Sequence, residues 1–359
     1  MSKLSVAVIY GGCNVEHEVS KASAATIFAA LSPDKYSVLP IYITKSGRWL
    51  LDDMPQGGTH SGGIEEFGRT AVICPDRGER GVIRLASGKA RGIPIDIVFP
   101  VLHGRQGEDG TIQGLCELAG LPYVGSGVIG SAIAMDKYYA NVVAQSLGIV
   151  RAPYIAYKAH ELRSEQDINA AAKHVRGKLG YPCFVKPSNS GSSVGISKAC
   201  NKAQLVKAIH AALELDRKIL VEKAITGREL ECSVIGNGEG DTFASEVGEI
   251  VSGEEFYTYD AKYHNSSSQT LAPADIPAEV RETVRKLSVE IFEGIDACGL
   301  ARVDFFWDEA GGTVYFNEIN TMPGFTSISM FPMLLNASGF TTPQIVDKLI
   351  ELGMSRRRV

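Results

Sequence analysis

Residues 302–324 read Arg-Val-Asp-Phe-Phe-Trp-Asp-Glu-Ala-Gly-Gly-Thr-Val-Tyr-Phe-Asn-Glu-Ile-Asn-Thr-Met-Pro-Gly, and they predict a β-hairpin. Two runs rich in β-branched and aromatic residues flank residues 308–312, whose composition is typical of a turn. Side chains alternate along a strand, so the first run places on one face Arg302, Asp304 and Phe306. The returning run likewise places on one face Phe316, Glu318 and Asn320.

The facing side chains of this hairpin suggest a metal site. If the turn centres near Gly311, Asp304 faces Glu318 and Arg302 faces Asn320, with opposed Cβ atoms about 5 Å apart. Two carboxylates at that distance repel each other unless a proton or a cation lies between them. Oxygen ligands without Cys or His suit Mg²⁺, and Arg302 beside such an ion can hold a transferring phosphoryl group. The alternative is a solvated acidic face, so the metal interpretation requires a phosphate site elsewhere in the chain.

Composition narrows the classes of protein that remain possible. The chain has 359 residues, 45% hydrophobic and 21% charged, which predicts a soluble globular protein of two or three domains. The net charge of −5 gives no reason to expect nucleic acid or an anionic membrane as partner. We expect neither a signal peptide nor a membrane span. The seven cysteines are scattered without C-x-x-C pairs, which indicates reduced thiols and a cytoplasmic location.

The first 125 residues follow a β-α-β pattern. Residues 4–10 and 38–43 are apolar strands on either side of a helix over residues 22–31, which predicts a parallel sheet. Residues 95–102 form a further strand buried on both faces. It ends in the polar run 103–110, at the end of a strand where α/β sheets bind their ligands.

Residues 125–130 (Gly-Ser-Gly-Val-Ile-Gly) match G-x-G-x-x-G and precede a predicted helix over residues 131–147. A dinucleotide site would also need an acidic residue about 20 positions further on, to hold the ribose. None occurs between Lys137 and His160. We therefore interpret the motif as a hinge and helix start, with nicotinamide binding as the alternative.

The rest of the chain divides into two further units. Between residues 153 and 223 we expect a small α+β unit, with a capping box at residues 164–167 opening a helix that ends at Gly180. From residue 228 we expect strands, a long polar loop over 252–270, a helix over 278–294 and then the hairpin. The predicted domains are residues 1–125, 126–221 and 222–359.

The central unit supplies a candidate phosphate site. The loop 188–195 is rich in small and hydroxyl residues, and its backbone N–H groups can cradle phosphate, although it is not a Walker A loop. Lys186 and Lys137 add positive charge. The strand 218–223 can hydrogen-bond an adenine edge with its main chain. An ordinary hairpin loop and an ordinary strand are the alternatives.

Together these segments resemble the ATP-grasp fold and, within it, the D-alanine–D-alanine ligases. Residues 103–114 (His-Gly-Arg-Gln-Gly-Glu-Asp-Gly-Thr-Ile-Gln-Gly) are similar to the first family signature without a gap, and residues 299–306 with 317–324 are similar to the second. Phe316 departs from the pattern, because an aliphatic residue is commoner there, and should change only packing. Shorter matches follow in order at Gly11-Gly12, residues 16–20, Met135-Asp136-Lys137 and Lys186-Pro187.

The resemblance implies a role for each matching residue. It implies an ATP site, closed by the loop 188–195, of Lys137, Lys186, Ser193, Glu222, Lys223, Ile225 and Glu229. It implies two Mg²⁺ or Mn²⁺ ions bound by Asp304, Glu318 and Asn320. Beside the first D-alanine it implies a hydrogen-bonded set of Glu16, Ser192 and Tyr263, with His103 near the substrate carboxylate. It implies an oxyanion site of Arg302 and the Gly324 N–H group, and a site for the second substrate of Lys262, Ser329 and Met330.

The implied activity is ATP-dependent synthesis of D-alanyl-D-alanine through a D-alanyl phosphate, for bacterial cell-wall precursors. A homodimer and a monovalent cation such as K⁺ are further expectations from the resemblance. The nearest alternative is a sister ligase that couples D-alanine to D-lactate or D-serine. Tyr263 resembles the dipeptide-forming type, but His264 follows it, and depsipeptide-forming relatives use a histidine in this loop. A nicotinamide oxidoreductase lacks its ribose acid, and a simple binding module would not need the clustered charges.

Overall fold

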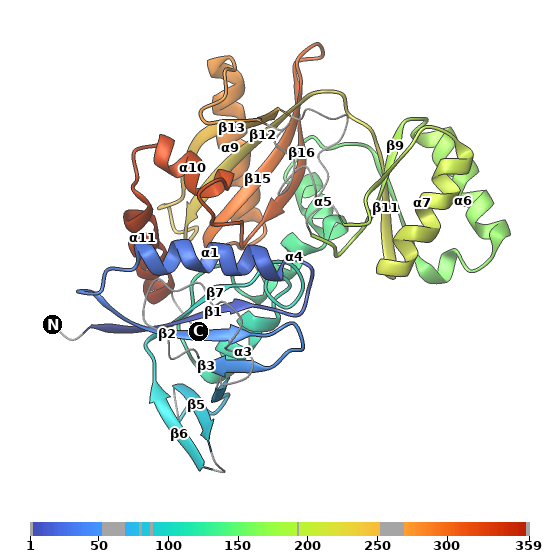
Figure 1. Ribbon diagram of the computed structural model, residues 1–359. Helices are drawn as coiled ribbons and strands as arrows, with labels where there is room; N and C mark the ends of the chain where they lie inside the picture. The colour runs from blue at the N-terminus through green and yellow to red at the C-terminus, as the bar shows by residue number, and fades with distance from the viewer. Residues whose placement is uncertain are drawn as a thin grey trace.

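The computed structural model describes residues 3–51, 69–78, 81–86, 89–191, 194–251 and 269–356. Within these residues the strands form sheets of seven, four and five strands, each built from a continuous segment of sequence. Figure 1 shows the seven-stranded sheet at the bottom in blue and cyan, the five-stranded sheet at the top and the four-stranded sheet at the right. The predicted combination of α/β and α+β parts is confirmed.

The N-terminal sheet has a parallel centre and an antiparallel extension. Its order is β6-β5-β4-β3-β2-β1-β7, and β1 (Leu4–Gly11) pairs parallel with β2 (Tyr36–Ile43) and β7 (Ile97–Val101). The antiparallel part, which we did not predict, comprises β3 (Trp49–Leu51), β4 (Arg69–Ile73), β5 (Gly81–Ala86) and β6 (Lys89–Pro94). Two residues separate β5 from β6, and a parallel pair would need a crossover of a dozen or more.

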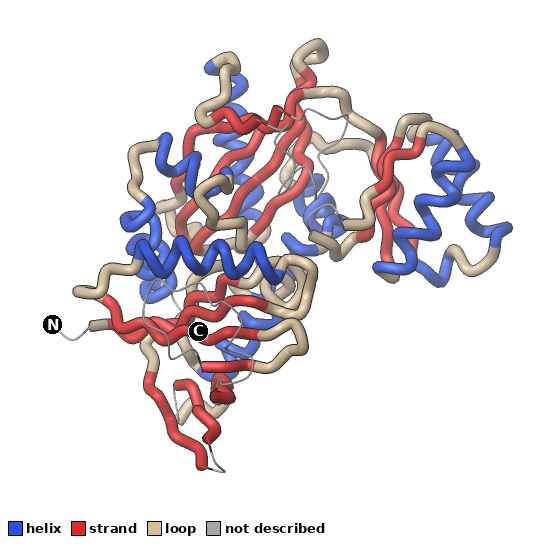
Figure 2. The backbone as a smooth tube through the Cα atoms, viewed as in Figure 1, coloured by secondary structure: helices blue, strands red, loops and turns tan. Residues whose placement is uncertain are grey.

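Helices cover both faces of this sheet and join it to the C-terminal part. One face packs in a common core with α1 (His17–Ala30) and α11 (Thr342–Ser355). The other face packs against α3 (Thr111–Ala119). Figure 2 shows α1 lying between the N-terminal strands and the C-terminal elements. The structure starts α1 five residues before the predicted start at residue 22, because the loop after β1 is shorter than expected.

The central unit is a four-stranded antiparallel sheet in the order β10-β9-β11-β8. Its strands are β8 (Tyr154–Lys158), β9 (Cys183–Pro187), β10 (Ser197–Ala199) and β11 (Lys218–Lys223). The helices α6 (Glu165–Lys178) and α7 (Lys202–Leu215) share its core, and the short helix η1 (Ala159–Glu161) follows β8. The predicted capping box is confirmed, since Ser164 Oγ accepts from Asp167 N and Asp167 accepts from Ser164 N.

The C-terminal sheet has the order β14-β13-β12-β15-β16. Its strands are β12 (Arg228–Gly236), β13 (Phe243–Val251), β14 (Gln269–Leu271), β15 (Gly299–Asp308) and β16 (Thr313–Asn320). One face packs against α9 (Ala278–Gly294), and the other is covered by α10 (Met330–Ala337), where Ser233 Oγ donates to the Phe331 carbonyl. No helix in the described ranges is both long and apolar enough to cross a membrane.

One predicted helix is two helices in the structure. The chain forms α4 (Val128–Met135) and α5 (Lys137–Ser146), with Asp136 in an extended conformation between them. The Asp136 carboxylate accepts from the N–H groups of Tyr138 and Tyr139, so it caps the second helix. The prediction of one helix over residues 131–147 was wrong because this cap restarts the helix. Both helices contact β16, and the predicted domain boundaries stay predictions.

Candidate active site

The hairpin β15–β16 has the predicted register. Arg302 lies opposite Asn320, and Asp304 lies opposite Glu318. A β-bulge follows, so that Phe305 pairs with Phe316 and Asn317 is the extra residue. Phe316 therefore lies in the core with Phe305, and the prediction that it shares a face with Glu318 was wrong.

A third carboxylate completes the row across the sheet. Glu231 of β12 lies opposite Asp304 on the other side of β15. Glu231, Asp304 and Glu318 are therefore aligned on three neighbouring strands, on the face that α10 covers. Sequence analysis missed Glu231, because the only sign of it was an acidic residue two positions after Glu229 in a strand.

Basic side chains lie between these carboxylates. Arg302 Nε and Nη2 lie 2.7 and 2.6 Å from the two Asp304 oxygens, and Nε lies 3.0 Å from Glu231 Oε2. Lys137 Nζ lies 3.0 Å from Glu318 Oε2. Burial alone would lower the pKa of Arg302, but Asp304 and Glu231 raise it well above its ordinary value. At Lys137, burial likewise lowers the pKa and the Glu318 carboxylate raises it, and the net shift of the pKa is upward.

Lys186, on β9 of the four-stranded sheet, also contacts the hairpin β15–β16. Its Nζ lies 2.6 Å from Glu222 Oε2, on the neighbouring strand β11, and donates to Asn317 Oδ1 at 3.2 Å. The bulge thus turns Asn317 toward Lys186, a contact that sequence analysis missed. The segment from Glu222 to Glu229, which includes Lys223 and Ile225, connects β11 with β12 and so joins the two sheets.

Lys137 is held by its neighbours in the chain and by the loop after β9. Its backbone N donates to the Ser188 carbonyl at 2.9 Å, and its Nζ donates to the Ser190 carbonyl at 2.8 Å. Asp136 accepts from Ser188 Oγ at 2.6 Å and pairs with Lys218 Nζ at 2.5 Å. Asp136 therefore fixes both the start of α5 and the loop that carries the predicted phosphate site.

The metal interpretation fits the chemistry of the donors. Asp304, Glu318 and Asn320 present oxygen atoms on adjoining positions, and Asn320 Nδ2 donates to Asp304 Oδ2 at 3.3 Å. Hard oxygen donors of this kind suit Mg²⁺ or Mn²⁺. In the described part of the chain no three His, Cys, Asp or Glu side chains are gathered as a ready cation site. Arg302 and Lys137 contact these carboxylates, so a cation bound there would replace some of their contacts with Asp304 and Glu318.

Glu16 lies in a second part of the site, at the start of α1. Its carboxylate occupies the space where Gly104 would carry a Cβ, and a Cβ on Gly191 would lie 3.1 Å from Glu16 Oε2. These two glycines therefore bring the first family signature and the loop 188–191 against Glu16. A cavity of about 510 Å³ is lined by Glu16, Ser190 and Gly191 among others. Because Ser190 also contacts Lys137, the loop joins the two parts of the site.

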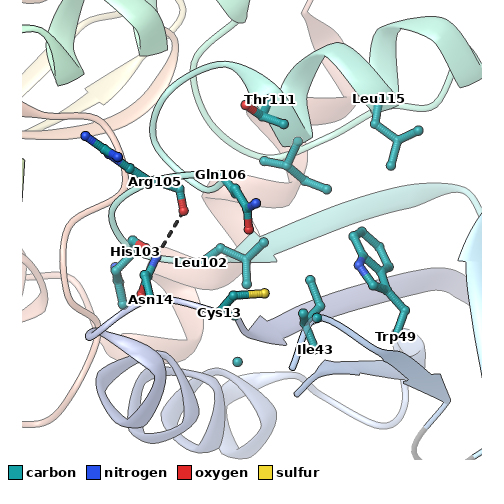
Figure 3. A pocket seen from close by; sticks show the side chains of 14 residues that line it. Cys13, Asn14, Ile43, Trp49, Leu102, His103, Arg105, Gln106, Thr111 and Leu115 are labelled. Atoms are coloured by element: carbon teal, nitrogen blue, oxygen red, sulfur yellow. Dashed lines mark hydrogen bonds between the residues drawn. The ribbon is translucent and has the colours of Figure 1, made fainter. Parts of the chain in front are cut away.

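A smaller cavity of about 280 Å³ adjoins the first and shares Cys13, Asn14 and Arg105 with it. Figure 3 shows Asn14 pointing to the backbone of Arg105, with Leu102 and Trp49 lining the apolar side. Asn14 Nδ2 donates to the carbonyls of His103 and Arg105 at 2.7 and 3.0 Å. Asn14 thus holds the first family signature against the end of β1.

His103 is tied to the segment that carries Gly324. His103 Nδ1 lies 2.9 Å from the Met322 carbonyl, which can only accept, so Nδ1 carries the proton. Nε2 then accepts from Ser23 Oγ at 3.0 Å, and Ser23 Oγ accepts from the Phe325 N–H at 3.1 Å. Met322 and Phe325 flank Gly324, so the position of Gly324 depends on Ser23, which sequence analysis missed. The predicted role of His103 beside a substrate carboxylate stays a prediction.

This contact network predicts a dependence of stability on pH. Burial lowers the pKa of His103, against the opposing effects of Glu16 and the Met322 carbonyl. Below about pH 6.5, His103 binds a proton in the unfolded chain, whereas in the folded chain it binds one only at a lower pH. The free energy of unfolding therefore decreases as the pH falls. Replacing His103 with Gln should flatten the dependence of the unfolding free energy on pH between 6.5 and 5.5, by up to about 1.4 kcal/mol per pH unit.

Urea unfolding at several pH values measures this slope. The control is His160→Gln, because His160 is exposed and its replacement should leave the slope unchanged. Equal slopes for wild type and His103→Gln would show that His103 titrates normally in the folded protein.

Four predicted site residues lie outside the described residues, namely Ser192, Ser193, Lys262 and Tyr263. Ser329 and Met330 stand at the start of α10, and Ser329 Oγ accepts from the Thr326 N–H at 3.1 Å. The structure therefore brings together Arg302, Asp304, Glu318, Asn320, Lys137, Lys186 and Glu222. It places Glu16, His103 and Gly324 in the adjoining part around α1.

The glycine motif at residues 125–130 contacts protein backbone. A Cβ on Gly130 would lie 2.8 Å from the Asp296 carbonyl, and Ser126 Oγ donates to the Cys298 carbonyl at 3.1 Å. These residues allow α4 to pack closely against the turn before β15. The interpretation of the motif as a helix start agrees with α4, which begins at Val128, and its interpretation as a hinge stays a prediction.

Solved structures share this fold over the whole chain. The VanG D-Ala:D-Ser ligase from Enterococcus faecalis matches with a TM-score of 0.85 and 36% identity, covering 98% of this chain and 100% of that chain. The D-alanine-D-alanine ligase from Coxiella burnetii matches with a TM-score of 0.85 and 34% identity, covering 99% and 94%. The fold is that of the ATP-grasp enzymes.

Sequence comparison defines the family. The model described as D-ala D-ala ligase N-terminus matches residues 5–126, and the one described as D-ala D-ala ligase C-terminus matches residues 143–351. D-alanine--D-alanine ligases from Caldicellulosiruptor bescii and Acetivibrio thermocellus are each 47% identical, over 100% and 99% of this chain and 97% and 96% of their own lengths. The chain belongs to the D-alanine–D-alanine ligase family, and the predicted resemblance is confirmed.

Proposed function

We propose that this chain uses ATP to join two D-alanine molecules into D-alanyl-D-alanine for peptidoglycan precursors. The observation that carries the proposal is that Lys137 contacts Glu318 and Lys186 contacts the adjacent Asn317, on the hairpin in which Glu318 lies opposite Asp304. Lysines there can bind phosphates, and the carboxylates can bind the cations that accompany them. Glu16 and the segment around Gly324 supply the adjoining site for amino acids.

The reaction needs two steps because a carboxylate is a poor acyl donor. In the first step an oxygen of the first D-alanine carboxylate attacks the γ-phosphorus of ATP, which forms an acylphosphate and releases ADP. Lys137 and Lys186 hold the phosphates, and Arg302 neutralises charge on the transferring group. Mg²⁺ or Mn²⁺ held by Asp304, Glu318 and Asn320 would supply further charge neutralisation.

In the second step the amine of the second D-alanine, after losing a proton, attacks the acyl carbon. Arg302 and the Gly324 N–H group stabilise the tetrahedral oxyanion, and inorganic phosphate leaves. The contacts of Met322 and Phe325 with His103 and Ser23 hold that N–H in place. Ser329 and Met330, at the start of α10, would receive the carboxylate of the second D-alanine.

The remaining roles belong to the same proposal. Glu222, Lys223, Ile225 and Glu229 would hold the adenosine, and Glu16 with Ser192 and Tyr263 would orient the first D-alanine. Ser193 would contact ATP, and Lys262 the second substrate. Homodimer formation, a K⁺ requirement and a cytoplasmic location are also proposed. None of the seven cysteines, all of which lie in the described residues, is in a disulfide bond, which supports a reducing compartment.

The second substrate decides between this activity and its relatives, and the Enterococcus faecalis neighbour is titled a D-Ala:D-Ser ligase. With equal D-alanine, D-lactate and D-serine, we expect D-alanyl-D-alanine as the main product near neutral pH. Its share over any ester should rise between about pH 6 and 9, because only the neutral amine attacks. Chiral chromatography of the products, with phosphate release, measures this. A majority of D-alanyl-D-lactate or D-alanyl-D-serine would contradict the proposal.

A further inference from the structure

The row of three carboxylates across the C-terminal sheet has one member without a role so far. Glu231, Asp304 and Glu318 are directly opposed on β12, β15 and β16. In the next row the opposed residues are Ser233, Arg302 and Asn320. Like charges opposed on neighbouring strands destabilise a sheet, so a buried row of this kind needs cations close by. Arg302 is the cation at the Glu231 end of the row, and Lys137 at the Glu318 end.

The two ends of the row differ in access. The side chain of Glu318 is 21% exposed, whereas those of Asp304 and Glu231 are 2% and 4% exposed. Beyond Glu231 the row continues to Gly248 of β13, where the side chains of Met330 and Leu334 fill the space that a Cβ would occupy. The Glu231 end is therefore closed, and phosphates reach the row from the Glu318 end, where Lys137 and Lys186 lie.

The geometry points to Glu231 as the positioning residue for Arg302. This inference rests on the proposed function, in which Asp304 turns to a cation that accompanies ATP. A carboxylate that binds a cation cannot keep both of its short contacts with one guanidinium group. Glu231, at the closed end and 3.0 Å from Arg302 Nε, remains to hold the arginine toward the reacting groups. Asp304 thus exchanges partners, and Glu231 does not.

The test is Glu231→Gln, which keeps the shape of the side chain and removes its charge. Loss of a supporting partner of this kind should lower kcat about 10- to 100-fold, with the KM for ATP within about threefold of wild type. Glu231→Asp, which keeps the charge, should give an intermediate kcat. If Glu231→Gln does not fold, a wild-type kcat for Glu231→Asp overturns the inference.

A matched control lies on the opposite face of the same sheet. Glu249 of β13 is buried and accepts two bonds from Arg228 at 2.7 and 2.6 Å, on the face that packs against α9. Glu249→Gln also breaks a buried arginine–carboxylate pair, so its melting temperature should fall by a comparable amount. Its kcat should stay within about twofold of wild type, since Glu249 lies on the face of the sheet opposite to that of Glu231 and Asp304. Equal kcat losses in both variants would show that Glu231 acts only through stability.

An Arg302→Ala background separates this inference from the proposed function. If Glu231 acts through Arg302, adding Glu231→Gln to Arg302→Ala should change kcat by less than about twofold. An Arg302→Ala variant with full activity would refute the proposed role of Arg302 itself. A strongly impaired Arg302→Ala variant beside an unimpaired Glu231→Gln variant would overturn only the role of Glu231.

Cation binding gives a measurement that does not depend on turnover. Mn²⁺ binding in the presence of ADP can be followed by electron paramagnetic resonance. Glu231→Gln should bind Mn²⁺ within about threefold of wild type, whereas Asp304→Asn should weaken binding at least about tenfold. Equal weakening by both substitutions would make Glu231 a metal ligand and overturn its role as a positioning residue.

Discussion

Replacing Glu318 with Gln is expected to leave the protein folded and to lower kcat about 10²- to 10³-fold. The substitution keeps the shape of the side chain but removes one charge from the predicted cation site, where each charge is worth several kcal/mol in the transition state. It also removes the partner of Lys137, whose raised pKa depends on that carboxylate. Stability should change little, because Glu318 lies at the open end of the row and is 21% exposed.

Rapid-quench measurement of ADP formation, with D-alanine and ATP in excess, isolates the first chemical step. The matched control is Glu246→Gln. Glu246 lies on β13 of the same sheet, and its partly exposed carboxylate pairs with Arg281 of α9. That variant should keep wild-type kinetics. Turnover close to wild type for Glu318→Gln at saturating Mg²⁺ would remove Glu318 from the cation site.

Replacing Arg302 with Ala is the second large effect, and it should appear in both chemical steps. Removing one preorganised donor to a developing oxyanion typically costs 10²- to 10³-fold in kcat. The variant also leaves the carboxylates of Asp304 and Glu231 without their shared cation, which should destabilise the fold by about 3–5 kcal/mol. The loss of activity must therefore be measured below the melting temperature of the variant.

Arg302→Lys distinguishes charge from geometry. Lysine keeps the positive charge but cannot make the paired contacts that Nε and Nη2 make with Asp304. We expect it to recover most of the stability and only part of the activity. Quench-flow rates of ADP formation and of dipeptide formation, compared with urea unfolding, measure both quantities. Full activity in Arg302→Lys would show that Arg302 acts only as a positive charge.

The sequence alone was sufficient for features that depend on near neighbours. Four residues separate β15 from β16, so alternation and turn composition predicted the pairing of Asp304 with Glu318. The capping box at Ser164 was predicted for the same reason. The bulge at Asn317 was not, because no residue type there requires an extra position. The family signatures extended the prediction to Lys137, Lys186 and Glu222, which the structure brings to the hairpin.

Tertiary structure alone decided which distant groups share one site. Glu231 lies beside Asp304 only because β12 pairs with β15, which begins more than 60 positions further on. The next strand in sequence after β12 is β13, not β15. Ser23 reaches Phe325 across 302 residues, through a core that α1 shares with the C-terminal helices. Such contacts depend on strand order and on packing between sheets, and alternation within one strand carries no information about either. The sequence showed which side chains carry charge or can bind a cation, and the fold determined which of them contact one another.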